Sequence, residues 1–313
     1  MRIVVSEFMD PAAIARLAER FDTASGEDLA DRREHLKRLL IDADALIVRN
    51  KTQVDADLLT AAPQLKVVGR LGVGLDNIDL LACKSRGIEV IAAFGANALA
   101  VGEYVIAAAL VLLRGAYSST QAVAAGKWPR PALSSGREIS GKTLGVLGFG
   151  QIGRLTGGLA RALGMNVIGF DAMISAEHPA WSAEHTTPRK FDELLREADV
   201  VSIHVPLTPA TRGLIDAGRL ELMKSDAVLI NTSRGEIVNE AELASALKAG
   251  RLGGAALDVF EHEPLAAGSP LAGCPRLLLT PHIAGVTRES NVRVSSMIAD
   301  KVADALERHR AKE

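Results

Sequence analysis

Short apolar runs rich in Val, Ile and Leu alternate along the chain with longer stretches in which apolar residues recur every three to four positions. The short runs predict buried strands and the longer stretches predict amphipathic helices, an alternation typical of parallel α/β sheets. In the first hundred residues we expect strands at 3–6, 45–49, 66–69 and 89–91 and helices at 11–20, 31–41, 54–62 and 77–86.

A second α/β series follows a long helical stretch. Residues 99–125 contain no proline and are rich in Ala, Leu and Val, which predicts one long helix with a break near Gly115. The polar, turn-rich segment 126–142 predicts a loop. Beyond it we expect strands at 143–147, 166–170, 199–205, 228–231, 255–258 and 277–280, and helices at 151–163, 191–197, 241–249 and 288–309.

Composition narrows the class of protein. With 313 residues, 48% of them hydrophobic and 24% charged, the chain is long enough for two globular domains. The net charge of −2 gives no reason to expect a nucleic acid or an anionic membrane as partner. The longest apolar run, 104–113, is about half of a membrane span, and the N-terminus turns acidic too early for a secretion signal. We expect a cytoplasmic protein.

The cysteines point to neither a disulfide framework nor a metal. Cys83 and Cys274 lie far apart and outside any CxxC pair, which fits a reducing compartment. No spacing typical of metal ligands occurs elsewhere in the sequence, so we expect no metal site.

A GxGxxG motif is the strongest local signal. Gly148, Gly150 and Gly153, with Gln151 and Ile152 between the last two, follow a predicted strand and open a predicted helix, which is the context that a dinucleotide-binding turn requires. The glycines serve in order for the tight turn, the approach of a pyrophosphate and close helix–strand packing, while the helix N-terminus attracts the phosphates. A glycine turn without ligand is the alternative that this context disfavours.

Asp171 ends the next predicted strand, at the separation expected for the residue that accepts hydrogen bonds from the adenosine ribose. A carboxylate at this position repels the 2′-phosphate of NADP. Ala172 and Met173, which follow, supply no compensating cation. The sequence therefore predicts NAD as cofactor in preference to NADP.

Three polar motifs follow later predicted strands, where ligands bind in open α/β sheets. They occupy residues 231–235, 258–264 and 280–285. Hydride transfer to a 2-oxo acid would need a cation for the carboxylate and keto oxygen, and a group that exchanges a proton. The planar guanidinium of Arg234 suits the first task, and His282 the second because histidine changes charge near neutral pH. Glu263 beside His282 would stabilise an imidazolium and orient the ring.

Together these motifs resemble the D-isomer-specific 2-hydroxyacid dehydrogenase family, which includes D-3-phosphoglycerate dehydrogenases and glyoxylate/hydroxypyruvate reductases. The resemblance runs nearly end to end through the segments GRLGVGLDNID, GFGQIGR, HVPLTPATRGLI, NTSRGEIV, ALDVFEHEP and TPHIAG. It implies that Arg234, Glu263 and His282 form the catalytic set. It also implies further cofactor contacts at His204, Val205, Pro206, Thr211, Thr232, Ser233, Arg234, Asp258, His282 and Gly285.

The resemblance implies a fold as well. Residues 1–98 and 283–313 should form a flavodoxin-like substrate domain, into which a Rossmann NAD-binding domain of residues 99–282 is inserted. Both would be doubly wound parallel-sheet domains. Members of the family usually pair through the nucleotide domains, so we expect a homodimer with residues 99–139 at its surface.

Glycines also follow the strand predicted at 66–69. Leu71, Gly72, Val73 and Gly74 form a loop whose backbone N–H groups could face an anion. By resemblance this loop binds the substrate carboxylate, and a turn without ligand is the alternative.

Arg49, Asn50 and Lys51 end another strand of the first domain. In phosphoglycerate dehydrogenases this position carries basic residues for the substrate phosphate. Two cations here would suit a three-carbon acid with a second anionic group, a phosphate or a sulfonate. A solvated strand end is the alternative, because Lys and Arg are mostly exposed. The substrate thus stays open among phosphoglycerate, sulfolactate and glycerate or glyoxylate types.

The function predicted is NAD-dependent interconversion of a small 2-hydroxy acid and its 2-oxo acid, with His282 as acid/base. An NAD(H)-sensing corepressor-type binding protein of the same fold is the alternative of a different class. A formate-type dehydrogenase would need Gln in place of Glu263.

Overall fold

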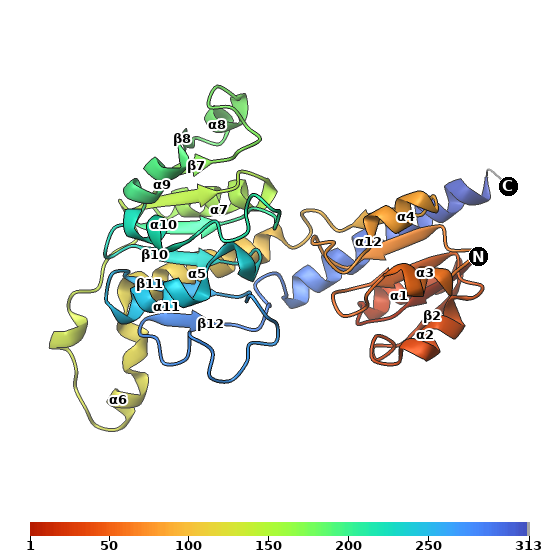
Figure 1. Ribbon diagram of the computed structural model, residues 1–313, viewed down its shortest axis with the longest axis horizontal. Coiled ribbons are helices and arrows are strands. Elements are labelled where there is room, and N and C mark those ends of the chain that lie inside the picture. Colours follow the sequence, from red (N-terminus) through yellow and green to blue (C-terminus); the bar gives the residue numbers. More distant parts are fainter. Residues whose placement is uncertain (312–313) are drawn as a thin grey trace. The chain divides into compact units, whose positions relative to one another are not determined.

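The computed structural model describes residues 1–311 and divides into two compact units (Figure 1). Unit 1 combines Met1–Asn97 with the described residues from Val286 onward, and unit 2 is Ala98–Gly285. In the sequence, unit 2 is therefore inserted into unit 1.

Unit 1 is built on a parallel sheet with the strand order β2-β1-β3-β4-β5, the flavodoxin-like order. Alternate strand residues face opposite layers of helices, so that α1 and α12 cover one face while α2, α3 and α4 cover the other. The strands are β1 (Arg2–Val5), β2 (Asp22–Ser25), β3 (Ala45–Val48), β4 (Val67–Arg70) and β5 (Glu89–Ala92). The helices are α1 (Pro11–Ala18), α2 (Arg33–Leu40), α3 (Ala56–Thr60), α4 (Leu80–Ser85) and α12 (Arg288–Arg310).

The C-terminal helix α12 belongs to this unit because it packs directly on β4 and beside α1 (Figure 1). Gly69 marks the contact, since a Cβ at this position would lie 2.7 Å from Val302 Cγ2 and 2.9 Å from Ile298 Cγ2. The absence of a side chain on β4 thus lets the helix approach the sheet closely.

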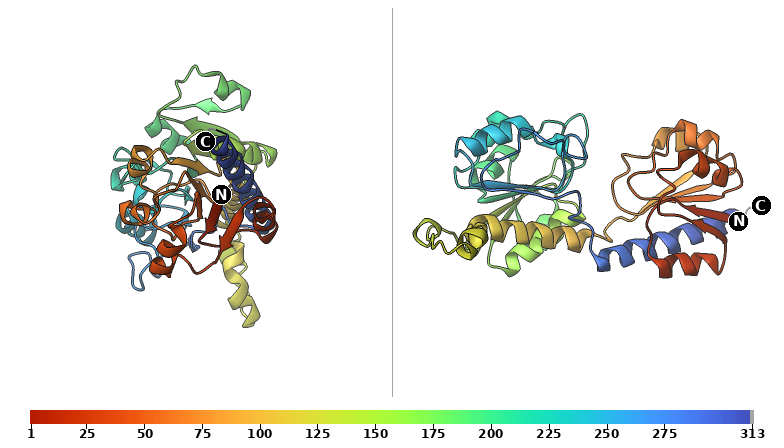
Figure 2. Two further views of the ribbon diagram at one scale, coloured as in Figure 1. Left: turned by 90° about the vertical axis from the view of Figure 1, so that its right-hand side faces the viewer. Right: turned by 90° about the horizontal axis from the view of Figure 1, so that it is seen from below.

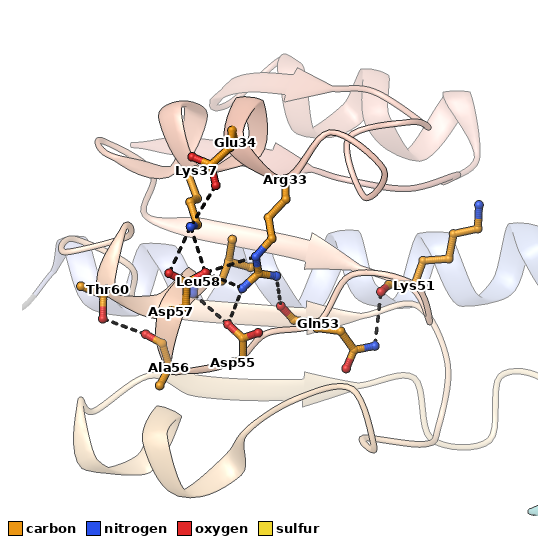
Figure 3. A network of polar contacts seen from close by, with 10 residues as sticks. All are labelled: Arg33, Glu34, Lys37, Lys51, Gln53, Asp55, Ala56, Asp57, Leu58 and Thr60. Carbon is orange, nitrogen blue, oxygen red and sulfur yellow. Dashed lines mark hydrogen bonds and ion pairs between the residues drawn. The ribbon is translucent and has the colours of Figure 1, made fainter. Parts of the chain in front are cut away.

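Charged side chains tie α2 to the start of α3 (Figure 3). Asp57 accepts from Arg33 Nη2 at 2.9 Å and from Lys37 Nζ at 3.0 Å. Asp55 caps α3 by accepting from the Leu58 N–H at 2.9 Å. Lys37 and Arg33 hold the pKa of the Asp57 carboxyl below its ordinary value.

Unit 2 has a parallel sheet of order β12-β11-β10-β9-β6-β7-β8, so the chain leaves the central strand β6 in both directions, as in Rossmann folds. Helices α5 and α7 cover one face, while α9, α10 and α11 cover the other (Figure 2). The strands are β6 (Thr143–Leu147), β7 (Asn166–Phe170), β8 (Thr187–Pro188), β9 (Val200–Ile203), β10 (Val228–Asn231), β11 (Gly254–Leu257) and β12 (Leu277–Leu279). The helices are α5 (Ala98–Arg114), α6 (Thr120–Ala124), α7 (Gln151–Ala162), α8 (Pro179–Ala183), α9 (Phe191–Glu197), α10 (Ala217–Leu222) and α11 (Glu240–Lys248).

The predicted fold class, two doubly wound parallel sheets, is confirmed. The break at Gly115 is also confirmed: this residue has a φ of 67° and separates α5 from the short helical turn Ala116–Ser119 and α6. The segment that carries α6 projects from the body of unit 2 (Figure 2). The short elements that the sequence patterns missed include β2, β8, α8 and α10.

Among the described residues, no single helix is long and apolar enough to cross a membrane. The bent pair Ala98–Arg114 and Ala116–Ala124 passes this test by length and composition only. Most apolar residues of Ala98–Arg114 are buried within unit 2, as expected of a core helix.

Candidate active site

The glycine turn lies between β6 and α7 in unit 2. Gly148 has a φ of 99°, and a Cβ there would lie 2.6 Å from the His204 carbonyl oxygen. A Cβ at Gly153 would lie 2.2 Å from the Gly148 oxygen, whereas a Cβ at Gly150 would meet no atom within 4 Å. Gly150 caps α7 without a side chain, so the first-turn N–H groups have no intrahelical partner. The turn is closed where the chain packs and open where a phosphate would approach.

Asp171 is bonded to this turn from the neighbouring strand. Its Oδ2 accepts from the Phe149 N–H at 2.7 Å, and its Oδ1 accepts from the Met173 N–H at 2.8 Å. The Phe149 ring is fully buried beneath the turn and stacks on Trp181 with a centroid distance of 4.1 Å. The carboxylate is thus held at the carboxyl end of β7.

A pocket of about 460 Å³ adjoins Asp171 and is lined also by Arg189 and Lys190. Two cations near the carboxylate were not anticipated from the sequence, because they lie 18 and 19 positions downstream. Arg189 is already engaged, since its Nε lies 2.9 Å from both carboxylate oxygens of Glu197.

Two side chains at the same edge of the sheet, those of Thr232 and His204, lie in surroundings that suit a bound nucleotide better than bulk water. The hydroxyl oxygen of Thr232 is buried and has no hydrogen-bond partner among residues 1–311. Burial lowers the pKa of His204 to about 4, so its ring is neutral at pH 7, and its Nε2 lies 2.9 Å from Ser202 Oγ. An unpartnered buried hydroxyl normally marks a site that a bound group completes. With the open turn at Gly150, these residues fit a dinucleotide.

The loop after β10 is shaped by Asn231, which is fully buried. Its Nδ2 donates to the Arg234 carbonyl at 2.8 Å and its Oδ1 accepts from the Ser233 N–H at 3.0 Å. Ser233 Oγ in turn donates to the Ile203 carbonyl on β9 at 2.8 Å. These bonds fix the backbone from which the Arg234 side chain extends.

Glu263 and His282 form a direct pair. His282 Nδ1 lies 2.7 Å from Glu263 Oε2, and Glu263 Oε1 accepts from the Phe260 N–H at 3.1 Å. An ionised carboxylate can only accept, so the hydrogen between the two groups is on Nδ1. This leaves Nε2 of the neutral ring with a lone pair, and the ring can accept a proton there.

The backbone at His282 adopts a left-handed conformation with a φ of 54°, which is rare for a residue with a side chain. Asp258, only 1% exposed, holds it there. The Asp258 carbonyl accepts from the His282 N–H at 2.8 Å, and its carboxylate accepts from the N–H groups of Ile283 at 2.8 Å and Ala284 at 2.7 Å. Backbone strain maintained by its surroundings is common at functional sites.

A hydroxyl chain extends this support to α5. Thr280 Oγ1 donates to Asp258 Oδ1 at 2.6 Å, and the Tyr104 hydroxyl lies 2.7 Å from Thr280 Oγ1. Because the one hydroxyl hydrogen of Thr280 goes to Asp258, Tyr104 is the donor in the second bond. Burial raises the pKa of Tyr104, and the nearby Asp258 charge raises it further. Tyr104 is a part of the site that sequence motifs did not indicate.

Unit 1 carries the residues predicted to bind the substrate, at the carboxyl ends of the adjacent strands β3 and β4. In the loop after β4, the N–H of Leu71 donates to the Val48 carbonyl and that of Gly72 to the Arg70 carbonyl, both at 2.8 Å. Within the described part of the chain, Val73 and Gly74 have no such bond, so the N–H groups free to meet an anion are theirs.

The two cations after β3 differ in their surroundings. Arg49 is half-buried, its Nη2 donates to Asn291 Oδ1 at 3.0 Å, and its guanidinium lies 5.9 Å from the centre of the Phe8 ring. Lys51 is exposed, lies 3.5 Å from Asp31, and extends away from the charged network at α3 (Figure 3). Asn50 between them is exposed. The structure thus orients one cation and leaves the other in solvent.

A Rossmann unit with an open glycine turn and an exposed histidine–carboxylate pair defines a nucleotide-dependent dehydrogenase. The family model described as "D-isomer specific 2-hydroxyacid dehydrogenase, NAD binding domain" matches residues 106–284. The chain belongs to the D-isomer-specific 2-hydroxyacid dehydrogenase family, whose members are NAD-dependent oxidoreductases, and the predicted resemblance and NAD cofactor are confirmed.

The chain is 49% identical over 304 residues to the (S)-sulfolactate dehydrogenase of Chromohalobacter salexigens, which covers 97% of this chain and 98% of that protein. It is 41% identical over 274 residues to the D-3-phosphoglycerate dehydrogenase of Archaeoglobus fulgidus, covering 87% of this chain and 51% of that protein. Among solved structures, the TT0316 protein from Thermus thermophilus superposes with a TM-score of 0.88 at 34% identity, over 98% of this chain and 97% of that one. The chain thus spans about half the length of the phosphoglycerate dehydrogenase.

We expect Asp171→Asn to lose much of its preference for NAD over NADP. The amide keeps an acceptor for the Phe149 N–H but removes the charge that repels a 2′-phosphate, while Arg189 and Lys190 remain. Hydrogen bonds to charged groups contribute about 1.5–3 kcal/mol, so the ratio of kcat/KM values should fall about 10–100-fold. Steady-state rates with both cofactors measure this ratio. Equal turnover of NAD and NADP by the unmodified enzyme would contradict the assignment of Asp171.

We expect His282→Asn to lose about 10²–10⁴-fold in kcat, the usual contribution of acid–base catalysis. Asparagine tolerates the left-handed backbone of this position but cannot exchange the proton. NADH fluorescence in the same preparations should show a much smaller change in cofactor affinity. A variant with nearly unchanged kcat would rule out His282 as the acid/base.

Proposed function

We propose that this protein interconverts a three-carbon 2-hydroxy acid bearing a sulfonate, (S)-sulfolactate, and the corresponding 2-oxo acid, sulfopyruvate, with NAD. The observation that carries the proposal is the 49% identity to an (S)-sulfolactate dehydrogenase over nearly the whole of both chains. The oriented guanidinium of Arg49 supports it. Arg234 is assigned to the substrate carboxylate, so a sulfonate at the other end of the substrate requires a second cation, which Arg49 in unit 1 could supply.

In the proposed mechanism, NAD held at the turn that carries Gly148, Gly150 and Gly153 would supply the acceptor for the hydride on C2 of the hydroxy acid. His282 Nε2 takes the hydroxyl proton, and Glu263 stabilises the imidazolium that results. Arg234 binds the substrate carboxylate and polarises the oxygen on C2. The remaining assignments to the cofactor stay predictions: Gly148, Gly150, Gln151, Ile152, Gly153, Asp171, His204, Val205, Pro206, Thr211, Thr232, Ser233, Asp258 and Gly285.

Unit 1 would bind the two ends of the acid through neighbouring loops. The N–H groups of Val73 and Gly74 would assist with the carboxylate. Arg49 would bind the sulfonate through its forked donors, one of which is held by Asn291. Lys51 would contribute only a screened charge, because it is exposed and lies near Asp31.

Oxidation of NADH, followed by absorbance, tests this proposal with sulfopyruvate, phosphohydroxypyruvate, hydroxypyruvate and glyoxylate side by side. We expect the highest kcat/KM with sulfopyruvate. Arg49→Met should raise the KM for sulfopyruvate about 10–100-fold, the cost of a lost charge-assisted bond, and leave that for glyoxylate nearly unchanged. Lys51→Met should have a much smaller effect. A preference for glyoxylate or hydroxypyruvate would contradict the sulfonate proposal.

We further propose that the protein forms a homodimer through the projecting segment of unit 2. Tyr117, Val123 and Trp128 in this segment expose large apolar side chains. A groove of about 830 Å³ beside the segment is lined by residues that include Leu133 and Arg276. Large exposed apolar surfaces on one element mark an interaction site. Light scattering should give twice the monomer mass, and a strictly monomeric mass would contradict the proposal. The cytoplasmic location stays a prediction.

A further inference from the structure

Glu7 is the buried carboxylate beneath the loop that carries Arg49. It follows β1, is 5% exposed, and accepts four consecutive backbone N–H groups from the neighbouring strand's loop. Its Oε1 accepts from Arg49 at 2.8 Å and from Thr52 at 3.0 Å. Its Oε2 accepts from Asn50 at 3.2 Å and from Lys51 at 3.0 Å. One side chain thus satisfies every backbone N–H of residues 49–52.

The carbonyl side of the same loop is held by Asn77, which is also buried. Its Nδ2 donates to the Thr52 carbonyl at 2.8 Å and to the Arg49 carbonyl at 3.3 Å. The loop has no regular secondary structure of its own, so its shape depends on these two side chains and on the buried contact between Ser6 Oγ and Thr52 Oγ1 at 2.8 Å. Since the backbone N–H groups of residues 49–52 are all bonded to Glu7, this loop can bind an external anion only through its side chains.

A buried carboxylate is costly unless it is hydrogen-bonded. Burial raises the pKa of Glu7, but the backbone bonds from Thr52, Lys51 and Arg49 outweigh this effect, and the pKa lies below its ordinary value. Glu7 is therefore ionised at neutral pH. Burial lowers the pKa of Arg49, and the charge of Glu7 opposes this effect without outweighing it.

The Arg49 guanidinium is oriented from another element, α12. Asn291, in the first turn of that helix, accepts from Arg49 Nη2 at 3.0 Å through its amide oxygen. The acceptor is neutral, so it fixes the direction of the guanidinium without cancelling its charge. A carboxylate in the same place would form an ion pair with Arg49 and compete with any substrate anion.

We propose that Glu7 and Asn291 are positioning residues that make this enzyme selective for a substrate with a second anionic group: Glu7 by building the loop that presents Arg49, Asn291 by orienting its guanidinium. The inference rests on the proposed function, in which Arg49 binds the sulfonate. Neither residue touches the reacting atoms, and both act through Arg49.

The test compares KM and kcat for sulfopyruvate and glyoxylate in the NADH-dependent reaction of the full-length enzyme. Asn291→Asp should raise the KM for sulfopyruvate at least about tenfold, because a carboxylate beside Arg49 repels and displaces the substrate anion. The KM for glyoxylate and both kcat values should change less than about twofold. Glu7→Gln should shift the same ratio in the same direction, since an amide offers one acceptor oxygen where two serve the loop.

Two further variants separate this role from a general loss of structure. Asp79→Asn is the matched carboxylate-to-amide control, because Asp79 accepts the Ala82 N–H at the start of α4 in the same unit and has no bond to Arg49. It should alter thermal stability without altering the ratio of KM values. In an Arg49→Met background, Asn291→Asp should have a much smaller effect on the KM for sulfopyruvate, because no guanidinium is left for the new carboxylate to pair with, as expected of residues that are coupled.

The outcomes distinguish the two proposals. If the unmodified enzyme does not prefer sulfopyruvate to glyoxylate, the proposed function and this inference both fail. If it does, but Asn291→Asp and Glu7→Gln keep the same ratio of KM values, only the inference is overturned. An equal rise in KM for both substrates would also overturn it, because that result indicates a structural role alone.

Discussion

Loops that leave the carboxyl end of a parallel sheet carry backbone N–H groups that no adjacent strand can satisfy, and an unpaired buried N–H is costly. In this protein, a carboxylate from the neighbouring strand repeatedly satisfies them. Glu7 after β1 serves the loop after β3, Asp171 after β7 serves the glycine turn after β6, and Asp258 after β11 serves the loop after β12. The shape of each of these three loops therefore depends on an acid that lies one strand away.

These three acids differ in how exposed their carboxylates are. Glu7 and Asp258 are almost fully buried and use both carboxylate oxygens to hold the chain on which Arg49 and His282 lie. Asp171 is only half-buried and lines a pocket, so its charge is placed where it would act on a bound nucleotide. The same interaction thus only supports the backbone in two places, whereas in the third we predict that the carboxylate also contacts the cofactor.

Strong local patterns determined how much could be predicted from the sequence. Strands β6, β7 and β10 have the bounds that their apolar runs predict, because they are buried on both faces. Strand β2 was missed since its residues, Asp-Thr-Ala-Ser, are partly exposed at the edge of the sheet. The pairing of His282 with Glu263 followed from motifs only 19 positions apart.

Contacts between segments far apart in the sequence could not be predicted in this way. Asn291, which orients Arg49, lies 242 positions from it along the chain. Tyr104 likewise lies 176 positions from its partner Thr280. No periodicity or short motif encodes a bond across such a separation, because it arises only when the sheet and its covering helices are assembled. For the same reason Arg49 and Lys51 looked equivalent in the sequence, although one is held by α12 and the other is solvated.

The proposed specificity depends on a guanidinium, held in unit 1, that recognises a second anionic group on the substrate. A crystal structure of the complex with NAD and sulfolactate would show whether this contact forms. We expect a sulfonate oxygen within about 3 Å of the Arg49 guanidinium, the distance of a charge-assisted hydrogen bond. A sulfonate bound away from Arg49, on other residues, would contradict it.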